Sequence, residues 1–290
     1  MSTQETRIDE SRSSRDKLKD REDEFLLPFE LKRLQGTFRE YLRIKRNNYL
    51  ATIEKFPVLW RCFELLDEIW MREFTDLEKI VEVKKMLPGI LFMNAHSRFL
   101  VALELAFSCC TSDAANILRS GIESVAHACK ILREPEQAAV WLDKDEGPAQ
   151  SKAFKKAFEQ KKREVLFPPE QRLDTLYHYW SHYSEIATHS TVSSIGLRFR
   201  EEQTASHISW RLNYFETDEA NLASFLFSFL VASLHMEDVL YRSFESRLKL
   251  DIGLGKMRIQ LGSLFGKTRQ QIIKKYGNEL LNRVQPTPQF

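Results

Sequence analysis

Residues 112–133, SDAANILRSGIESVAHACKILR, have the pattern of a central helix that carries a polar stripe. The polar members recur at three- and four-residue spacing and share one face: Asn116, Arg119, Ser120, Glu123 and His127. The remaining positions are mostly apolar, as the core of a helical bundle requires. Because burying an unpaired Arg or Glu costs several kcal/mol, we expect side chains elsewhere in the chain to bind this stripe.

The composition favours an all-α fold. Of 290 residues only 10 are glycine and 9 are proline, too few for a sandwich or barrel with many tight turns. Long segments carry apolar residues at helical spacing, so we expect a multi-helix bundle of long antiparallel helices. A short β-hairpin or extended flap is expected near residues 195–215, where apolar and polar residues alternate. The net charge of +2 indicates no particular class of partner.

The sequence divides into three expected parts. Residues 1–27 are dense in charges of both signs and poor in apolar residues, which predicts a disordered leader. Residues 28–250 are expected to form the helical bundle domain. Residues 251–290 are expected to be a basic C-terminal appendage with one helix, from residue 268 to residue 283.

Prolines and capping residues set the expected helix bounds, which are 28–56, 57–86, 90–110, 112–133, 170–190 and 217–250. Pro88 and Gly89 should separate the second helix from the third. Side-chain oxygens should cap the helices that begin near residues 112 and 217. The capping residues are Thr111, Ser112 and Asp113 for the first of these, and Thr217, Asp218 and Glu219 for the second.

Cysteine usage and hydropathy predict a cytoplasmic protein. The four cysteines lie in apolar helical patterns and lack the spacing of a metal site or a redox pair, so we expect reduced, buried thiols and neither metal nor cofactor. The longest apolar run, residues 220–234, is shorter than the roughly 20 residues that span a bilayer. We therefore expect a core helix there and no membrane association.

A second polar stripe repeats the spacing of the first. Ser181, Glu185 and His189 recur four residues apart in the expected helix 170–190. If this helix lies beside helix 112–133, Arg119 could bridge the carboxylates of Glu123 and Glu185 with its planar fork of donors.

Three interpretations of this constellation stay open. The polar groups could satisfy one another and fix the helices in register. They could form a general acid/base site for phosphodiester cleavage, with Arg119, Glu123, His127, Glu185 and His189 as candidate catalytic residues. They could also join Glu104, His235 or Glu237 in a metal centre, although carboxylate sites in helical bundles use Glu-x-x-His rather than Glu-x-x-x-His.

Basic residues gather in two places. Arg39, Arg43 and Arg46 share a face of the first expected helix, and Lys274 and Lys275 lie in the basic C-terminal segment. These five residues are the candidates for contact with phosphate, and therefore for RNA binding without catalysis.

Three short motifs resemble a family of uncharacterised bacterial all-helical domains of unknown function. They are the pair Arg119 and Glu123, the dipeptide Trp141-Leu142, and residues 184–190 with the sequence SEIATHS. The resemblance covers residues 90–236, and Arg119, Glu123 and His189 match the polar positions of that family. Its general plan is similar to HEPN-like domains, some of which cleave RNA as dimers in defence and toxin systems. The segment from Arg172 to His178 matches the loose Arg-x(4–6)-His pattern of those ribonucleases.

The sequence favours an intracellular binding or assembly module with a buried Arg/Glu/His network, whose partner is another protein or a second copy of the chain. Two alternatives remain, a metal-independent HEPN-like ribonuclease and an RNA-binding protein without catalysis. Whether the chain is an enzyme is left open by these patterns.

Overall fold

The computed structural model describes residues 36–77, 83–158, 163–169, 173–187, 199–203, 208–246, 248 and 252–282. The chain divides into two compact units, Met1–Asn47 and Asn48–Phe290. In the first unit the described residues form the beginning of helix α3 (Gly36–Lys55). The predicted leader, residues 1–27, lies outside the described residues.

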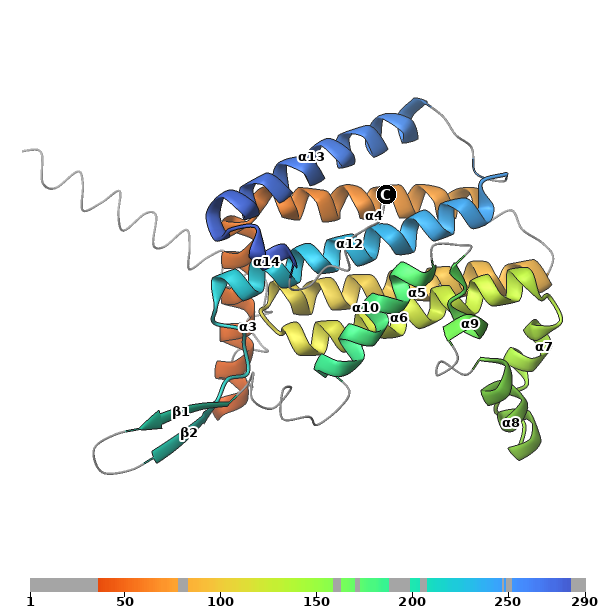
Figure 1. Cartoon of the computed structure of the whole chain (residues 1–290), viewed down its shortest axis with the longest axis horizontal. Coiled ribbons are helices and arrows are strands. Elements are labelled where there is room, and N and C mark those ends of the chain that lie inside the picture. Colours follow the sequence, from red (N-terminus) through yellow and green to blue (C-terminus); the bar gives the residue numbers. More distant parts are fainter. Residues whose placement is uncertain are drawn as a thin grey trace, which may run out of the picture. The chain divides into compact units, whose positions relative to one another are not determined.

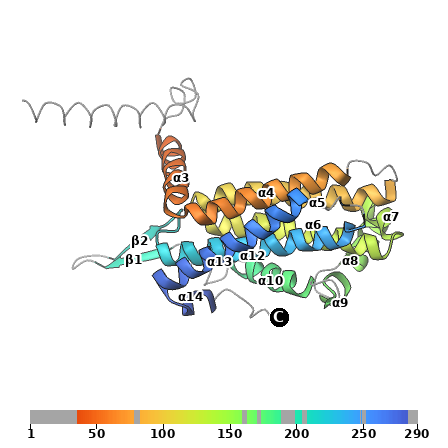
Figure 2. The same ribbon diagram turned by 90° about the horizontal axis from the view of Figure 1, so that it is seen from above.

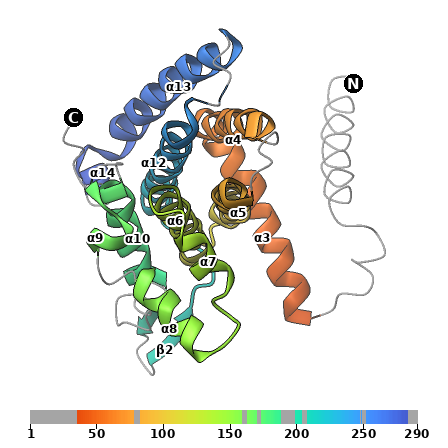
Figure 3. The ribbon, with the colours of Figure 1, turned by 90° about the vertical axis from the view of Figure 1, so that its right-hand side faces the viewer.

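The second unit is built on a ring of long helices. Helix α4 (Pro57–Leu77) contacts α5 (Val83–Phe107), α5 contacts α6 (Thr111–Arg133), and α12 (Glu219–Phe244) packs against both α6 and α4. The helices run side by side in Figures 1 and 2, and Figure 3 shows them almost end on. The predicted all-α bundle is therefore confirmed, with α5 and α6 paired as a helical hairpin.

Two further helices cover the ring on two sides. Helix α10 (Leu173–Ala187) packs on α6 and α12, whereas α13 (Ile252–Tyr276) packs on α4 and α12 (Figure 1). The remaining described helices are α7 (Gln137–Leu142), α8 (Pro148–Ala157), α9 (Arg163–Leu166) and α14 (Glu279–Asn282). Helix α6, which carries the first polar stripe, therefore contacts α5 and α12 of the ring and is also covered by α10.

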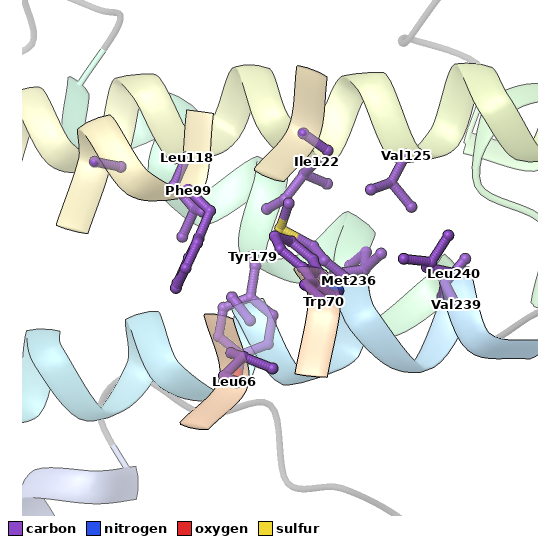
Figure 4. Close-up of a cluster of buried hydrophobic side chains, with 14 of the residues drawn as sticks. Leu66, Trp70, Phe99, Leu118, Ile122, Val125, Tyr179, Met236, Val239 and Leu240 are labelled. Atoms are coloured by element: carbon purple, nitrogen blue, oxygen red, sulfur yellow. The ribbon is translucent and has the colours of Figure 1, made fainter. Parts of the chain in front are cut away.

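The core fills the centre of the ring with aromatic and aliphatic side chains (Figure 4). Phe63 is fully buried and meets the rings of Phe99, Phe107 and Phe229 at centroid distances of 5.6–6.2 Å. Trp70 packs edge-on against Phe99 at 5.3 Å. Such tilted and T-shaped pairs stabilise a core beyond the apolar area that they bury.

Gly121 lies where α6 packs closely against α5 and α12. A Cβ atom on Gly121 would lie 3.2 Å from the methyl group of Met236, 3.3 Å from Cβ of Arg98 and 3.4 Å from the carbonyl oxygen of Ala95. The last two atoms belong to, or lie next to, the backbone of α5 and cannot turn away. The absence of a side chain at Gly121 therefore lets the helical hairpin pack closely.

The expected hairpin region contains two antiparallel strands. Strand β1 (Phe199–Gln203) pairs with β2 (Ile208–Leu212), with Phe199 opposite Leu212 and Glu201 opposite Trp210. Alternation of apolar and polar residues over residues 195–215 was the signal for this hairpin.

Two expectations about helix ends are wrong. Pro88 and Gly89 lie inside α5, which begins at Val83, because the buried side chains of Leu87 and Leu91 hold the helix on the core across the proline. Cys110 precedes α6, and no side chain caps that helix. The expected cap of α12 is present, since the Asp218 carboxylate accepts the Asn221 N–H at 2.9 Å.

The C-terminal helix also differs from the expectation. It begins at Ile252 rather than at residue 268, and its buried side chains Leu254, Leu261, Thr268 and Ile272 belong to one face. The glycines between them favour a flexible segment by propensity alone, but burial of this face on α4 and α12 outweighs that preference. Helix α13 is therefore part of the core of the second unit, not an appendage to it.

Within the described ranges, two helices are long and apolar enough to cross a membrane, Met86–Phe107 of α5 and Glu219–Phe244 of α12. A core helix of a soluble bundle passes the same test. In the structure 83% of the apolar window of α12 is buried among other helices, compared with 50% for α5. The run 220–234 thus lies in the core, as expected, while the prediction of no membrane association stays a prediction.

Candidate functional site

The polar stripe of α6 meets α10 at a shared carboxylate. Arg119 donates from Nη1 to Oε1 of Glu123 over 2.5 Å, and Trp180 of α10 donates from Nε1 to the same oxygen over 2.8 Å. The side chains of Arg119 and Glu123 are each only about one-fifth exposed (21% and 19%). The expectation that these two helices are neighbours is therefore confirmed, and a tryptophan supplies the contact between them.

The structure does not bring Glu185 into this network. Glu185 is exposed, and among the described residues it makes no ion pair with Arg119. It follows Trp180 by five residues, which places it about 140° further around α10. The expected bridge between Glu123 and Glu185 is thus replaced by one between Glu123 and the indole N–H of Trp180.

His127 is enclosed by aromatic rings. The indole of Trp141 donates to Nδ1 over 3.4 Å, and the imidazole meets the rings of Phe154 and Phe158 at 5.9 and 5.0 Å. Burial, and to a lesser degree the positive charge of Lys144, lowers the pKa of His127 to about 4. His127 is therefore neutral at pH 7, and a base so weak is poorly suited to carry protons there.

His189 lies outside the described residues, so the expected convergence of Arg119, Glu123 and His189 stays a prediction. The described residues support only the part of the constellation that contains Arg119, Glu123 and Trp180.

A second buried network joins three helices, and sequence reasoning missed it. Arg258 of α13 donates from Nη2 to Glu73 of α4 over 2.7 Å and also to Glu237 of α12. Its guanidinium lies 4.0 Å from the centroid of the Tyr241 ring. The Glu73 side chain is fully buried and that of Glu237 is 6% exposed. We call Arg258, Glu73, Glu237 and Tyr241 the Arg258 cluster.

Only one carboxylate charge of the Arg258 cluster is balanced by the arginine. Burial raises the pKa of Glu73, and burial together with the nearby Glu73 carboxylate raises that of Glu237 well above its ordinary value. Two carboxyl groups this close in a dry interior do not both ionise, so the pair shares one proton, and the pKa of Glu237 is raised the more strongly. The cluster is then close to neutral, which lowers the free-energy cost of burying it in the core.

One signal could have revealed this cluster. Glu73 falls on the apolar stripe of α4 that contains Leu66, Trp70 and Leu77, at helical spacing. A carboxylate on such a stripe needs a buried cation. Which cation could not be known, because Arg258 is 185 positions away in the sequence.

The metal interpretation has no support in the part of the chain that the structure describes. Glu237 binds Arg258, and Glu104 is exposed on α5. Across the described ranges no group of three or more His, Cys, Asp and Glu side chains is arranged to hold a metal ion.

A cavity of about 610 Å³ lies where the corner between α3 and α4 meets the last turns of α13. Both walls belong to the second unit. Its lining residues are Glu54, Lys55, Phe56, Pro57, Val58, Leu59, Thr268, Gln271, Ile272, Lys274, Lys275 and Tyr276. We call this space the α4–α13 cavity.

Glu219, the first residue of α12, ties the two walls of the α4–α13 cavity together. Its carboxylate pairs with Lys55 on one wall, and on the other it accepts from Lys275 over 2.5 Å and from the Tyr276 hydroxyl. These hydrogen bonds, with that from Lys275 the strongest, lower the pKa of Glu219 to about 2. The carboxylate is thus ionised at neutral pH and holds the cavity walls in place.

The candidate nucleic-acid contacts occupy different settings. Lys274 and Lys275 line the α4–α13 cavity. In the first unit, Arg39 is exposed, Arg46 is half-buried, and Arg43 pairs with Glu40 at 2.6 Å. RNA binding stays a prediction.

No protein-family model matches the chain, and no curated protein or solved structure matches it either. The resemblance to uncharacterised bacterial helical domains therefore rests on the short motifs alone.

Replacing Glu123 with alanine should lower the free energy of unfolding by about 2 kcal/mol, because Arg119 and Trp180 both lose their acceptor. In a Trp180→Phe background the loss should be smaller by about 1 kcal/mol, since one donor is already gone. Urea unfolding of the four proteins in this cycle measures both values. Glu185→Ala on the exposed face of α10 is the control, and an equal loss in that variant would contradict the assignment.

The enclosed imidazole predicts a pH dependence. The pKa of His127 is about 4 in the folded chain and near 6.5 in the unfolded chain, so the unfolded chain binds more protons between these values. Stability should therefore fall as the pH drops from 6.5 towards 4. When the pH is lowered from 7 to 5, the free energy of unfolding of His127→Phe should fall by about 1–2 kcal/mol less than that of the wild type. Urea unfolding at the two pH values measures this difference. Trp141→Phe, which keeps the imidazole, should retain the wild-type pH response; a wild-type response in His127→Phe would contradict the prediction.

Proposed function

We propose that this chain is an intracellular binding module whose ligand occupies the α4–α13 cavity, and that the Arg119–Glu123–Trp180 network holds helices together rather than performing chemistry. The observation that carries the structural role of this network is that Oε1 of Glu123 has two donors from within the protein. One oxygen of this carboxylate already accepts from Arg119 and from Trp180, which come from the same protein and leave no role for a substrate at that atom.

The neighbouring groups favour the same function. His127 is neutral and is enclosed by Trp141, Phe154 and Phe158, and its basic nitrogen, Nδ1, already accepts from Trp141. A general acid/base site needs a group that titrates near the working pH and reaches its substrate. The ribonuclease alternative therefore rests on His189, which is outside the described residues.

The α4–α13 cavity has the character of a binding site. Its volume of about 610 Å³ falls within the range of ligand sites, roughly 300–1,000 Å³. Apolar side chains line much of it and a few polar groups converge at its edge, as in sites that bind small molecules. Its described lining residues include no histidine, cysteine or aspartate, and two of its three lysines, Lys55 and Lys275, are ion-paired with Glu219.

Binding of the neutral dye N-phenyl-1-naphthylamine to the full-length chain tests the proposal. Its fluorescence should rise to saturation with the wild type, because the cavity offers the dye an apolar environment. Gln271→Trp should abolish this rise, since an indole at this exposed lining position would fill the cavity without disturbing the core. Gln270→Trp, on the adjacent exposed residue that does not line the cavity, is the matched control and should bind as the wild type does.

Two results would contradict the proposed function. The first is dye binding that is absent from the wild type or equal in the Gln271→Trp and Gln270→Trp variants. The second is cleavage of single-stranded RNA by the purified wild type that His189→Ala abolishes while leaving the unfolding midpoint unchanged.

A further inference from the structure

We infer that the α4–α13 cavity takes an amphipathic organic anion, in which an apolar group is joined to one carboxylate, sulfonate or phosphate. This inference rests on the proposed function and names the chemical class of its ligand. Two features of the cavity support it, namely its apolar floor and, at its edge, Lys274, for which the described residues provide no ion pair.

The floor of the cavity is apolar and rigid. Leu59 and Ile272 are 2% and 3% exposed, and they join the core of the second unit beneath the cavity. Phe56 and Val58 extend the apolar wall at the corner between α3 and α4. A ligand seated here would remove apolar surface from water, which favours an aliphatic or aromatic group over a sugar or a free inorganic ion.

The edge of the cavity is basic. Lys55, Lys274 and Lys275 line it, compared with one lining carboxylate, Glu54. Glu219 holds the ammonium groups of Lys55 and Lys275 in place. Lys274 is exposed, and the described part of the chain provides no ion pair for it. Its ammonium group can therefore neutralise an anion without first breaking an ion pair with a described residue.

Three helix ends meet at the cavity. Val58 and Leu59 bring backbone amide groups from the start of α4, while Pro57 has no N–H to donate. The last turns of α3 and α13 face the same space with the negative ends of their helix dipoles. The helix ends therefore offset one another, and the positive charge available to an anion comes from Lys274.

A purely structural explanation accounts for only part of this arrangement. Lys274 and Lys275 lie in the last turn of α13, where cations offset the negative end of the helix dipole. That effect explains two ammonium groups at the end of a helix. The ion pairs of Lys55 and Lys275 with Glu219 explain the third lysine, on the opposite wall. Neither effect requires an apolar cavity beside an exposed Lys274.

The experiment compares two dyes that differ by one anionic group. These are N-phenyl-1-naphthylamine, which is neutral, and 1-anilinonaphthalene-8-sulfonate, which carries a sulfonate. Both are titrated into full-length wild type, Lys274→Gln and the matched control Lys267→Gln, an exposed lysine of α13 that does not line the cavity. Competition by octanoate and by octyl phosphate then distinguishes a carboxylate ligand from a phosphate ligand.

The charged dye should bind the wild type more tightly than the neutral one, and about 0.5 M sodium chloride should remove most of this difference by screening. Lys274→Gln should weaken binding of the charged dye by about three-fold and leave the neutral dye unaffected, because one exposed ion pair contributes on that order. Lys267→Gln should change neither affinity. Gln271→Trp should abolish binding of both dyes.

Two outcomes would overturn the inference while leaving the proposed function standing. One is equal affinity of the wild type for both dyes when Gln271→Trp still abolishes binding. The other is an equal effect of Lys274→Gln and Lys267→Gln on the charged dye. Failure of the neutral dye to bind in the cavity would instead overturn the proposed function itself, so the two failures are distinguishable.

Discussion

Arg258 joins the last long helix, α13, to α4 and α12, and the position of α13 depends on that contact. Its guanidinium binds Glu73 of α4 and Glu237 of α12 and lies over the ring of Tyr241. Neither carboxyl group could be buried alone without a cost of several kcal/mol. With one shared proton and one arginine the cluster is close to neutral, so burial is tolerated and α13 is held in a single register.

The position of α13 then determines the candidate binding site. The last turns of this helix form one wall of the α4–α13 cavity, and the corner between α3 and α4 forms the other. Glu219 joins the two walls through Lys55 and Lys275. The Arg258 cluster orients the helix near its start, and Glu219 fixes it near its end. The network around Glu123 has a different role, since it joins α10 to α6 on the other side of the ring.

Much of the fold could be predicted from local patterns, and the partners of its polar groups could not. Apolar spacing predicted the long helices, and alternation over residues 195–215 predicted the hairpin that forms there. The same patterns failed at Pro88 and at the start of α13, where burial of a helix face outweighs the local preference of proline and glycine. Periodicity describes one helix at a time. The course of α5 through Pro88 and the start of α13 are instead determined by packing between helices.

The candidate site illustrates the same limit. The sequence predicted contact between Arg119 and Glu123 because they lie four residues apart on one helix. It did not predict their third partner, Trp180, because the single N–H of its indole is easily overlooked in an aromatic segment. Glu73, Glu237 and Arg258 come from three helices, and no spacing within the sequence relates them. The α4–α13 cavity likewise combines residues near 57 with residues near 272.

Amide hydrogen exchange of the full-length chain tests most directly whether α13 belongs to the bundle. If the Arg258 cluster and the buried face of α13 hold this helix in the core, amides in the middle of α13 should exchange as slowly as those in the middle of α12, through the same global unfolding event. Exchange of the α13 amides that is orders of magnitude faster, and independent of unfolding of α12, would contradict the structure of the core and remove one wall of the proposed binding site.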